Sequence, residues 1–200
     1  MPVTVVGDEI ISGFNRDALA RLFNLSEEKQ KRLAGLWLFE TFDKILAAVV
    51  RAARQVPPEQ LMWHTPDRNR PLKLFCYHIL ADPKHVLDAI STQKYDGAFK
   101  LTYAEESERY RTMEEIAAFG NEIRARVSDA STKLSPEILG RTINGYAGII
   151  TGHELLHQVL SHTAHHLRQL YEMLRMIGIQ PIEPLEEEDF QGISMPKDLW

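Results

Sequence analysis

The sequence of 200 residues contains a single cysteine, Cys76. No intramolecular disulfide can form, so we expect the reducing environment of the cytoplasm. No stretch approaches the roughly 18 consecutive apolar residues that a membrane-spanning helix requires, and we expect no membrane partner. The first 15 residues carry acids early and have no basic segment ahead of an apolar block, so we expect no signal peptide.

Basic residues are also in deficit. The chain has 23 Lys and Arg against 28 Asp and Glu, a formal net charge of −5. It lacks a Lys/Arg stripe, so a nucleic-acid partner is not expected. It also has no glycine-rich phosphate loop. The sequence shows no internal repeat. A chain of this length with 44% hydrophobic residues can bury one sizeable core, so we expect one principal domain.

Apolar residues do recur at spacings of three and four, which is typical of helices that bury one face. The first long helix is predicted to begin after Ser26 and to end at the prolines 57–58, with Leu38, Phe42, Ile45, Val49 and Ala52 on its buried face. A second is predicted from Pro71 to about residue 91. Within it, Asp82 followed by Pro83 matches a helix cap and first turn, so we expect a kink or a restart there.

Two further helices begin with capping boxes, the pattern Ser/Thr-x-x-Glu. One box occupies 112–115 and starts a helix over 112–127, and the other occupies 151–154 and starts a helix over 152–177. Gly178 is expected to end the last helix. No segment shows the strong period-2 alternation of a half-buried strand. The sequence therefore predicts an all-α fold, most simply a four-helix bundle.

The predicted organisation has three parts. Residues 1–25 form an N-terminal lead-in with weak patterning, apart from a short helix over 16–23 that Asn15 would cap. Residues 26–178 form the bundle. Residues 179–200 form a C-terminal tail with three prolines and an acidic run. We expect this tail to wrap the surface, with Phe190 and Trp200 as packing anchors.

Histidine is concentrated in one segment, since five of the eight histidines lie in 151–169, TGHELLHQVLSHTAHHLRQ. Two pairs one helical turn apart compete as metal sites. His153 and His157 belong to HELLH, which fits the zinc-protease pattern H-E-x-x-H. His162 and His166 belong to HTAHHLRQ. At about 100° per residue the two pairs project in different directions, so they cannot share one ion.

Three observations favour the second pair. His162 and His166 lie at the edge of the apolar stripe, and a bundle builds metal sites from side chains that face its core. Glu154 is explained by its capping box, where it also faces the positive end of the helix dipole. The further ligand of the longer zinc-protease motifs is absent after His157. A metalloprotease is therefore the less favoured interpretation.

Two histidines are an incomplete site, because zinc and similar ions take at least three protein ligands. His78 is the best third candidate, since it lies in an apolar arc of the second helix. A lone buried histidine is more often a hydrogen-bonded core residue, but three inward-facing ones would each need a separate partner. His64 and His85 are weaker candidates. Asp82 lies one turn beyond His78 on the same face and could support a ligand from behind.

These residues resemble a known family. PLKLFCYHIL at 71–80, followed about 80 residues later by HTAHHLRQ, is similar to the DinB/YfiT-like superfamily of small four-helix bundles. In that family one histidine of the second helix and two of an H-x-x-H-H-x-x-Q run bind a metal. The resemblance implies that His78, His162 and His166 are the ligands. Leu167 and Arg168 replace the common Arg-Gly, while Gln169 is retained and is expected to support a ligand.

The resemblance also implies an activity, because members include thiol-dependent S-transferases, isomerases and metal-dependent hydrolases, and several are homodimers. We expect a divalent ion, zinc or nickel by its affinity for imidazole. It would activate water or a low-molecular-weight thiol for hydrolysis or transfer on a small molecule. A homodimer is expected, and no catalytic residue is assigned.

Two non-catalytic alternatives stay open: a metal- or ligand-binding bundle, and histidines that only form hydrogen bonds in the core. If the protein is an enzyme, we expect the ion to have an open coordination position in a pocket lined by residues such as Phe75, Tyr77 or Tyr171. Cys76 lies about 160° from His78 on the helix, so we interpret it as a core residue and not as a nucleophile.

Overall fold

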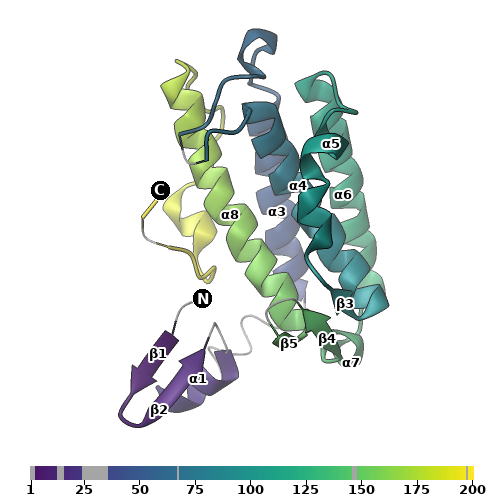
Figure 1. The fold of residues 1–200 in the computed structure, drawn as a ribbon, viewed down its shortest axis with the longest axis vertical. Helices are drawn as coiled ribbons and strands as arrows, with labels where there is room; N and C mark the ends of the chain where they lie inside the picture. Colours follow the sequence, from purple (N-terminus) through teal and green to yellow (C-terminus); the bar gives the residue numbers. More distant parts are fainter. Residues whose placement is uncertain (1–2, 13–15, 24–35, 67, 146–147, 197) are drawn as a thin grey trace.

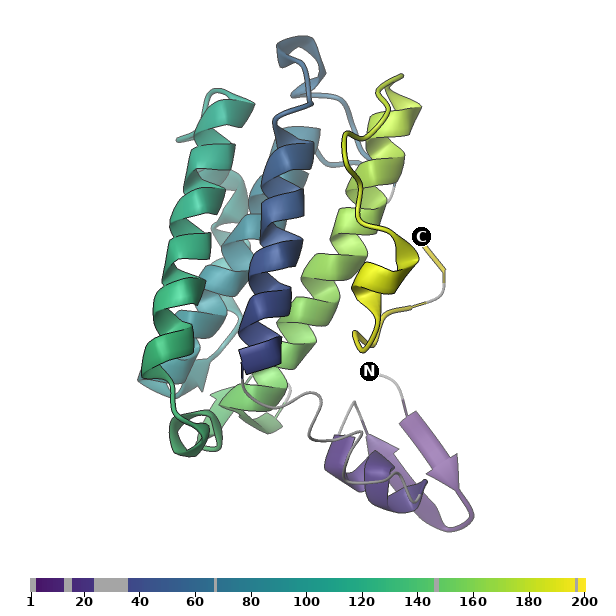
Figure 2. The same cartoon turned by 180° about the vertical axis from the view of Figure 1, so that it is seen from behind.

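A computed structural model describes residues 3–12, 16–23, 36–66, 68–145, 148–196 and 198–200. Four long helices lie side by side in it: α3 (Leu36–Ala53), α4 (Leu72–Thr92), α6 (Met113–Lys133) and α8 (Gly152–Met176). Figures 1 and 2 show them from opposite sides. The predicted four-helix bundle is therefore confirmed. Among the described helices, none is both long and apolar enough to cross a bilayer.

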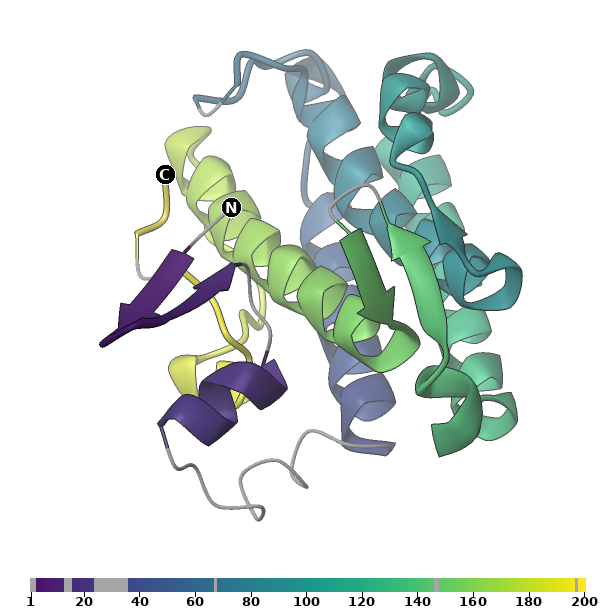
Figure 3. The same ribbon diagram turned by 60° about the horizontal axis from the view of Figure 1, so that its bottom comes forward.

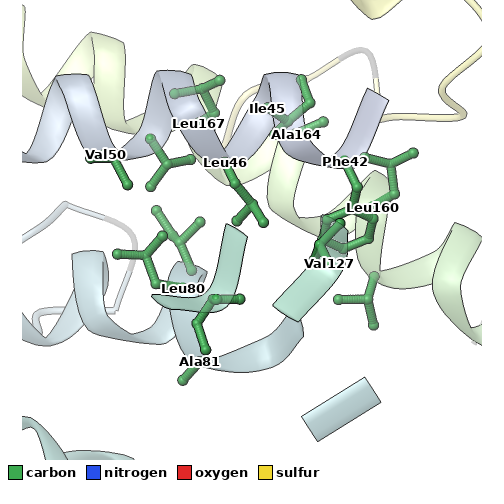
Figure 4. Close-up of a cluster of buried hydrophobic side chains, with 14 of the residues drawn as sticks. Phe42, Ile45, Leu46, Val50, Leu80, Ala81, Val127, Leu160, Ala164 and Leu167 are labelled. Atoms are coloured by element: carbon green, nitrogen blue, oxygen red, sulfur yellow. The ribbon is translucent and has the colours of Figure 1, made fainter. Parts of the chain in front are cut away.

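The core lies where the four helices meet. α3 packs on α6 and α8, and α4 packs on the same two helices. The predicted buried face of α3 is confirmed, since its five residues are at most 1% exposed. Figure 4 shows how side chains of all four helices interlock: Phe42, Ile45, Leu46 and Val50 of α3, Leu80 and Ala81 of α4, Val127 of α6, and Leu160, Ala164 and Leu167 of α8.

The signals for where helices begin and end were mostly accurate. Both capping boxes form, with Thr112 accepting from the backbone of Glu115 and Thr151 from that of Glu154. Gly178 follows α8 with a φ of +85°, the left-handed conformation that ends a helix. Helix α6 runs six residues past the predicted end, to Lys133. The predicted start of the first helix, after Ser26, lies outside the described residues.

The expected restart at Asp82-Pro83 is wrong, because α4 continues through Pro83 as one helix. Proline removes a single helical donor, and the packing of its neighbours outweighs that loss here. Pro83 is itself buried in the bundle. Asp82 therefore does not cap a helix. Its carboxylate is 4% exposed and accepts a hydrogen bond from the hydroxyl of Tyr103.

The sequence predicts long connections over residues 92–111 and 130–150, with a helical turn near AEESERY at 104–110. The structure has α5 (Tyr103–Ser107) at that turn, together with further short elements that were not predicted. The first connection holds β3 (Lys94–Tyr95), the 3-10 turn η2 (Ala98–Leu101) and α5. The second holds α7 (Pro136–Leu139), β4 (Thr142–Gly145) and β5 (Gly148–Thr151). The strands form a sheet in the order β3-β4-β5, with β3 parallel to β4 and β4 antiparallel to β5. Figure 3 shows this sheet at one end of the bundle, where β5 leads directly into α8.

The N-terminal lead-in also has more structure than predicted. β1 (Val3–Val6) and β2 (Glu9–Ser12) form an antiparallel hairpin in which Val3 faces Ser12. The predicted short helix is present as α1 (Arg16–Leu22), while its proposed cap, Asn15, lies outside the described residues. The hairpin and α1 lie outside the four-helix bundle (Figure 1).

The C-terminal tail folds back along the bundle (Figure 2). The backbone N–H of Leu185 donates to the hydroxyl of Tyr171 at 3.0 Å, and Lys44 pairs with Asp189. The tail contains the short turn η3 (Glu187–Phe190), and a second such turn, η1 (Pro58–Gln60), follows α3. Phe190 is 9% exposed and acts as the expected anchor, whereas Trp200 is 53% exposed and does not.

Candidate metal centre

Three histidines meet between α4 and α8. His78 comes from α4, and His162 and His166 come from successive turns of α8. One ring nitrogen from each lies within 4.8 Å of the other two. The ring centroids of His162 and His166 are 4.2 Å apart, and His78 lies 5.1 and 5.2 Å from them. The helical spacing aligns the pair, and the packing of α4 against α8 adds the third ring.

The ring of His166 is held on two sides. The Phe75 ring meets it edge-on, with centroids 5.2 Å apart. Its Nδ1 is hydrogen-bonded to Oε1 of Gln169, a residue of the next turn that is 5% exposed. An amide oxygen only accepts, so Nδ1 carries the proton and Nε2 is left with its lone pair. Gln169, which the sequence placed near the face of His162, thus lies directly behind His166.

Asp82 lies behind the other two histidines. Its Oδ2 is 3.1 Å from Nδ1 of His162, and its Oδ1 is 3.6 Å from Nδ1 of His78. The Tyr103 hydroxyl donates to the same carboxylate. One buried carboxylate thus lies behind two rings of the cluster, the position from which carboxylates support metal-bound histidines. Sequence reasoning missed Tyr103, because it lies on the short helix α5 inside a predicted connection.

The electrostatics keep His78 and His166 neutral. Burial lowers the pKa of His78 to about 4 and that of His166 to about 2, because it disfavours the charged ring. Burial alone would raise the pKa of Asp82, but the contacts with His162 and His78 lower it to about 2. His78 and His166 are therefore neutral near pH 7, the form in which imidazole binds a metal.

The cluster opens to solvent on one side. The His162 side chain is 38% exposed and that of His78 is 13% exposed. The Arg70 guanidinium lies 4.6 Å above the Phe75 ring, so a cation stands beside the cluster. A small molecule could approach along the exposed edge of His162.

Of the three aromatic residues predicted to line this opening, only Phe75 is beside it. Tyr77 points away and stacks on Phe119, with centroids 5.4 Å apart. Tyr171 lines a cleft of about 980 Å³ between α8 and the tail, which none of the three clustered histidines lines. Tyr103, which was not predicted, is the tyrosine that lies beside the cluster, since its ring centroid is 5.3 Å from that of His78.

The competing HELLH motif forms no such group. Within the part of the chain that the structure describes, no set of three convergent ligands includes His153 or His157. The Glu154 carboxylate accepts from both the backbone N–H and the hydroxyl of Thr151, as its capping role requires. It is therefore engaged at the start of α8 and not placed to activate water. These contacts argue against the metalloprotease alternative.

The remaining candidates lie outside the cluster. His64 shares a hydrogen bond of 3.0 Å with Asn69, and His85 stacks on Phe99 with centroids 4.2 Å apart. Cys76 is buried, and burial raises the pKa of its thiol to about 12. A thiol that stays protonated and has no access to solvent does not act as a nucleophile, as the sequence predicted.

Comparison with known proteins identifies the family and supports the fold. The family model of the DinB superfamily matches residues 41–170, which include all three histidines. Among solved structures, YfiT from Bacillus subtilis, described as a probable metal-dependent hydrolase with an unusual four-helix bundle topology, is 16% identical with a TM-score of 0.60. That match covers 78% of this chain and 90% of YfiT, and at this identity it shows the fold. No curated protein matches. The chain belongs to the DinB superfamily.

Proposed function

We propose that this protein is a metal-dependent enzyme in which His78, His162 and His166 hold one divalent ion. The convergence of three ring nitrogens within 4.8 Å is the observation that carries the proposal. Three buried or half-buried imidazoles on two helices have no structural need to face one another. Their hydrogen-bonding needs would be met more simply by separate partners.

The residues fit such an ion. Ligand nitrogens at about 2.1 Å from a tetrahedral ion are separated by about 3.4 Å, so a small inward movement of the rings suffices. Three protein ligands leave a position open, as catalytic sites require. Imidazole ligands suit zinc and nickel. When bound, the ion would lower the pKa of a coordinated water or thiol and supply hydroxide or thiolate near neutral pH.

The protein's own residues then have separate tasks. Asp82 orients His162 and faces His78, and Gln169 holds the proton of His166 on Nδ1. Phe75 shields the buried side of the cluster. The exposed edge of His162 leaves room for a small substrate, which is the class of substrate that the family resemblance implies.

Hydrolysis is the reaction that we test first, because it is the activity ascribed to YfiT. Thiol transfer is the second candidate, and one contact favours it. Asp82, the carboxylate that touches the cluster, is already bound by Tyr103 and His162, so it is not available to deprotonate a water. A low-molecular-weight thiol is more acidic than water before it binds, so on the ion it would release its proton to solvent without such a base.

The first experiment measures the metal content of protein purified without a histidine tag and exposed to zinc or nickel. Elemental analysis should find about one ion per chain in the wild type and in His153→Ala, and little in His162→Ala. His153→Ala is the matched control, because it removes an imidazole from the same helix. An ion retained in His162→Ala, or lost in His153→Ala, would disprove the site.

The second experiment separates the reactions. The loaded wild type is assayed against a panel of small esters and amides, and separately for conjugation of a low-molecular-weight thiol to an electrophile. His162→Ala should abolish whichever activity is found, and His153→Ala should retain it. A metal-loaded protein inactive in both assays would leave the non-catalytic binding bundle as the function. Homodimer formation and the cytoplasmic location stay predictions, and sedimentation velocity tests the first.

A further inference from the structure

The last part of the tail is held against α8 by side chains of that helix. Ser161 donates to the carbonyl of Ser194, Arg168 to that of Pro196 at 3.3 Å, and Gln169 to that of Leu199 at 2.6 Å. All three bonds reach main-chain carbonyls, so they depend on the path of the tail more than on its side chains. Upstream, Phe190 and Ile193 are buried and fix where this segment starts.

The bond to Leu199 has a consequence for Gln169. A glutamine amide has one group that accepts, the carbonyl oxygen, and one that donates, the NH₂. The Leu199 carbonyl only accepts, so it selects the orientation in which the NH₂ faces the tail. The amide oxygen must then face the other way, where it meets Nδ1 of His166.

The same logic extends to His166. A neutral imidazole carries one proton, and the Gln169 oxygen holds that proton on Nδ1. Nε2 is then the nitrogen with a free lone pair. If the amide were reversed, its NH₂ would face Nδ1 and favour the proton on Nε2, which blocks that nitrogen as a ligand. Gln169 is 5% exposed with the tail in place, so the tail and not water faces its amide NH₂.

We propose that the described end of the tail, residues 194–196 and 198–200, positions the metal centre. The Leu199 carbonyl sets the Gln169 amide, which holds His166 in the tautomer that binds metal through Nε2. This inference rests on the proposed metal site. It makes Leu199 and Gln169 positioning residues, and it assigns to the tail a role that the family's histidine motif does not contain.

A chain that ends at Met195 tests the proposal, because it keeps the buried Phe190 and Ile193 but lacks the Leu199 carbonyl. Its zinc affinity is measured by competition with a chromophoric chelator. Loss of a partner behind a metal-bound histidine typically weakens binding 10- to 100-fold, and we expect a loss of about 10-fold or more. Trp200→Ala is the matched control, since it retains that carbonyl and alters an exposed side chain, and its affinity should be unchanged.

Gln169→Ala should weaken zinc binding to a similar degree. The shortened chain that also carries Gln169→Ala should bind zinc no more weakly than Gln169→Ala alone. Both changes break the same relay, the hydrogen bonds that connect Leu199 through Gln169 to His166. Full additivity of the two losses would show that the tail acts by another route. Gln169→Glu offers a second check, since a carboxylate accepts from His166 whatever faces its other oxygen. In that background, shortening the chain should have little effect.

The tautomer of His166 is read in the metal-free protein from the ¹⁵N shifts of its imidazole. The wild type should carry its proton on Nδ1, and the shortened chain should show a mixture or the proton on Nε2. An unchanged tautomer with unchanged zinc affinity would overturn the proposal while leaving the metal site intact. A wild type that binds no zinc would instead refute the proposed function, and the tautomer would still decide whether the relay exists.

Discussion

Gly120 is a buried residue inside α6, at a point where side chains of α3 and α4 pack against that helix. A Cβ placed on it would lie 2.6 Å from Cγ2 of Val50 on α3 and 3.0 and 3.1 Å from the two methyl groups of Leu80 on α4. Carbon atoms normally rest about 3.5–4.0 Å apart. Val50 is 3% exposed and Leu80 is 0% exposed, so neither can swing into solvent. We therefore expect Gly120→Ala to force the three helices apart.

Two opposing effects decide how much Gly120→Ala changes the free energy of unfolding. Helix propensity alone makes alanine about 1 kcal/mol more favourable than glycine in a helix interior. Overpacking a filled core typically costs about 1–3 kcal/mol, and the β-branched Val50 has little rotamer freedom to yield. With a contact as short as 2.6 Å, the upper part of that range applies. The net loss should be about 1–2 kcal/mol, a fall in Tm of about 2–8 °C for a chain of this size.

Urea unfolding followed by far-UV circular dichroism measures the change. Val50→Ala removes the atom that the new methyl would meet, so Gly120→Ala should cost less in that background than in the wild type. Glu122→Ala, on the exposed side of the same helix, is the control and should change stability by less than about 0.5 kcal/mol. If Gly120→Ala stabilised the protein by about 1 kcal/mol, propensity would govern this position and the close approach of the helices would be refuted.

Three further predictions concern other parts of the fold. Thr151→Ala removes the cap of α8 and should cost about 1 kcal/mol by urea unfolding, whereas Thr151→Ser should cost little. Cys76 is fully buried, so a thiol reagent should label it far more slowly in native protein than in urea, and rapid native labelling would contradict its core position. Burial would raise the pKa of Glu106, but hydrogen bonds from Tyr77 and Thr102 lower it below its usual value. The ionised Glu106 therefore stabilises the fold fully at pH values above its usual pKa, and this stabilisation is lost as pH falls through the lower pKa of the folded state. Glu106→Gln should therefore make the free energy of unfolding depend less on pH on the acid side. An unchanged pH dependence would contradict this.

Some site residues followed from local rules. His162 and His166 are four residues apart on a helix, so they share a face in any fold that keeps that helix. Thr151 and Glu154 satisfy each other within one turn, which separated the HELLH motif from the site before any packing was known. His78 required more, because its place opposite the pair depends on α4 packing against α8. The family resemblance supplied that pairing from sequence.

Asp82 shows where a local signal misled. Aspartate before proline is a common start of a helix, so the sequence predicts a helix cap at this position. In the structure, Tyr103 of α5 and His162 of α8 both contact the carboxylate, which is buried between the helices and caps none of them. The short strands escaped prediction for a related reason. Strands of two to four residues show too few alternations to be distinguished from a connection.

The sequence by itself determined the four long helices, the capping-box starts of α6 and α8 and the pair of histidines on α8, because each depends on contacts within a few residues along the chain. Tertiary structure decided which third histidine joins them, which carboxylate lies behind them and which aromatic rings surround them. It alone decided that the Leu199 carbonyl meets Gln169. Every residue has a backbone carbonyl, so no sequence pattern distinguishes the one that the folded tail brings to the cluster.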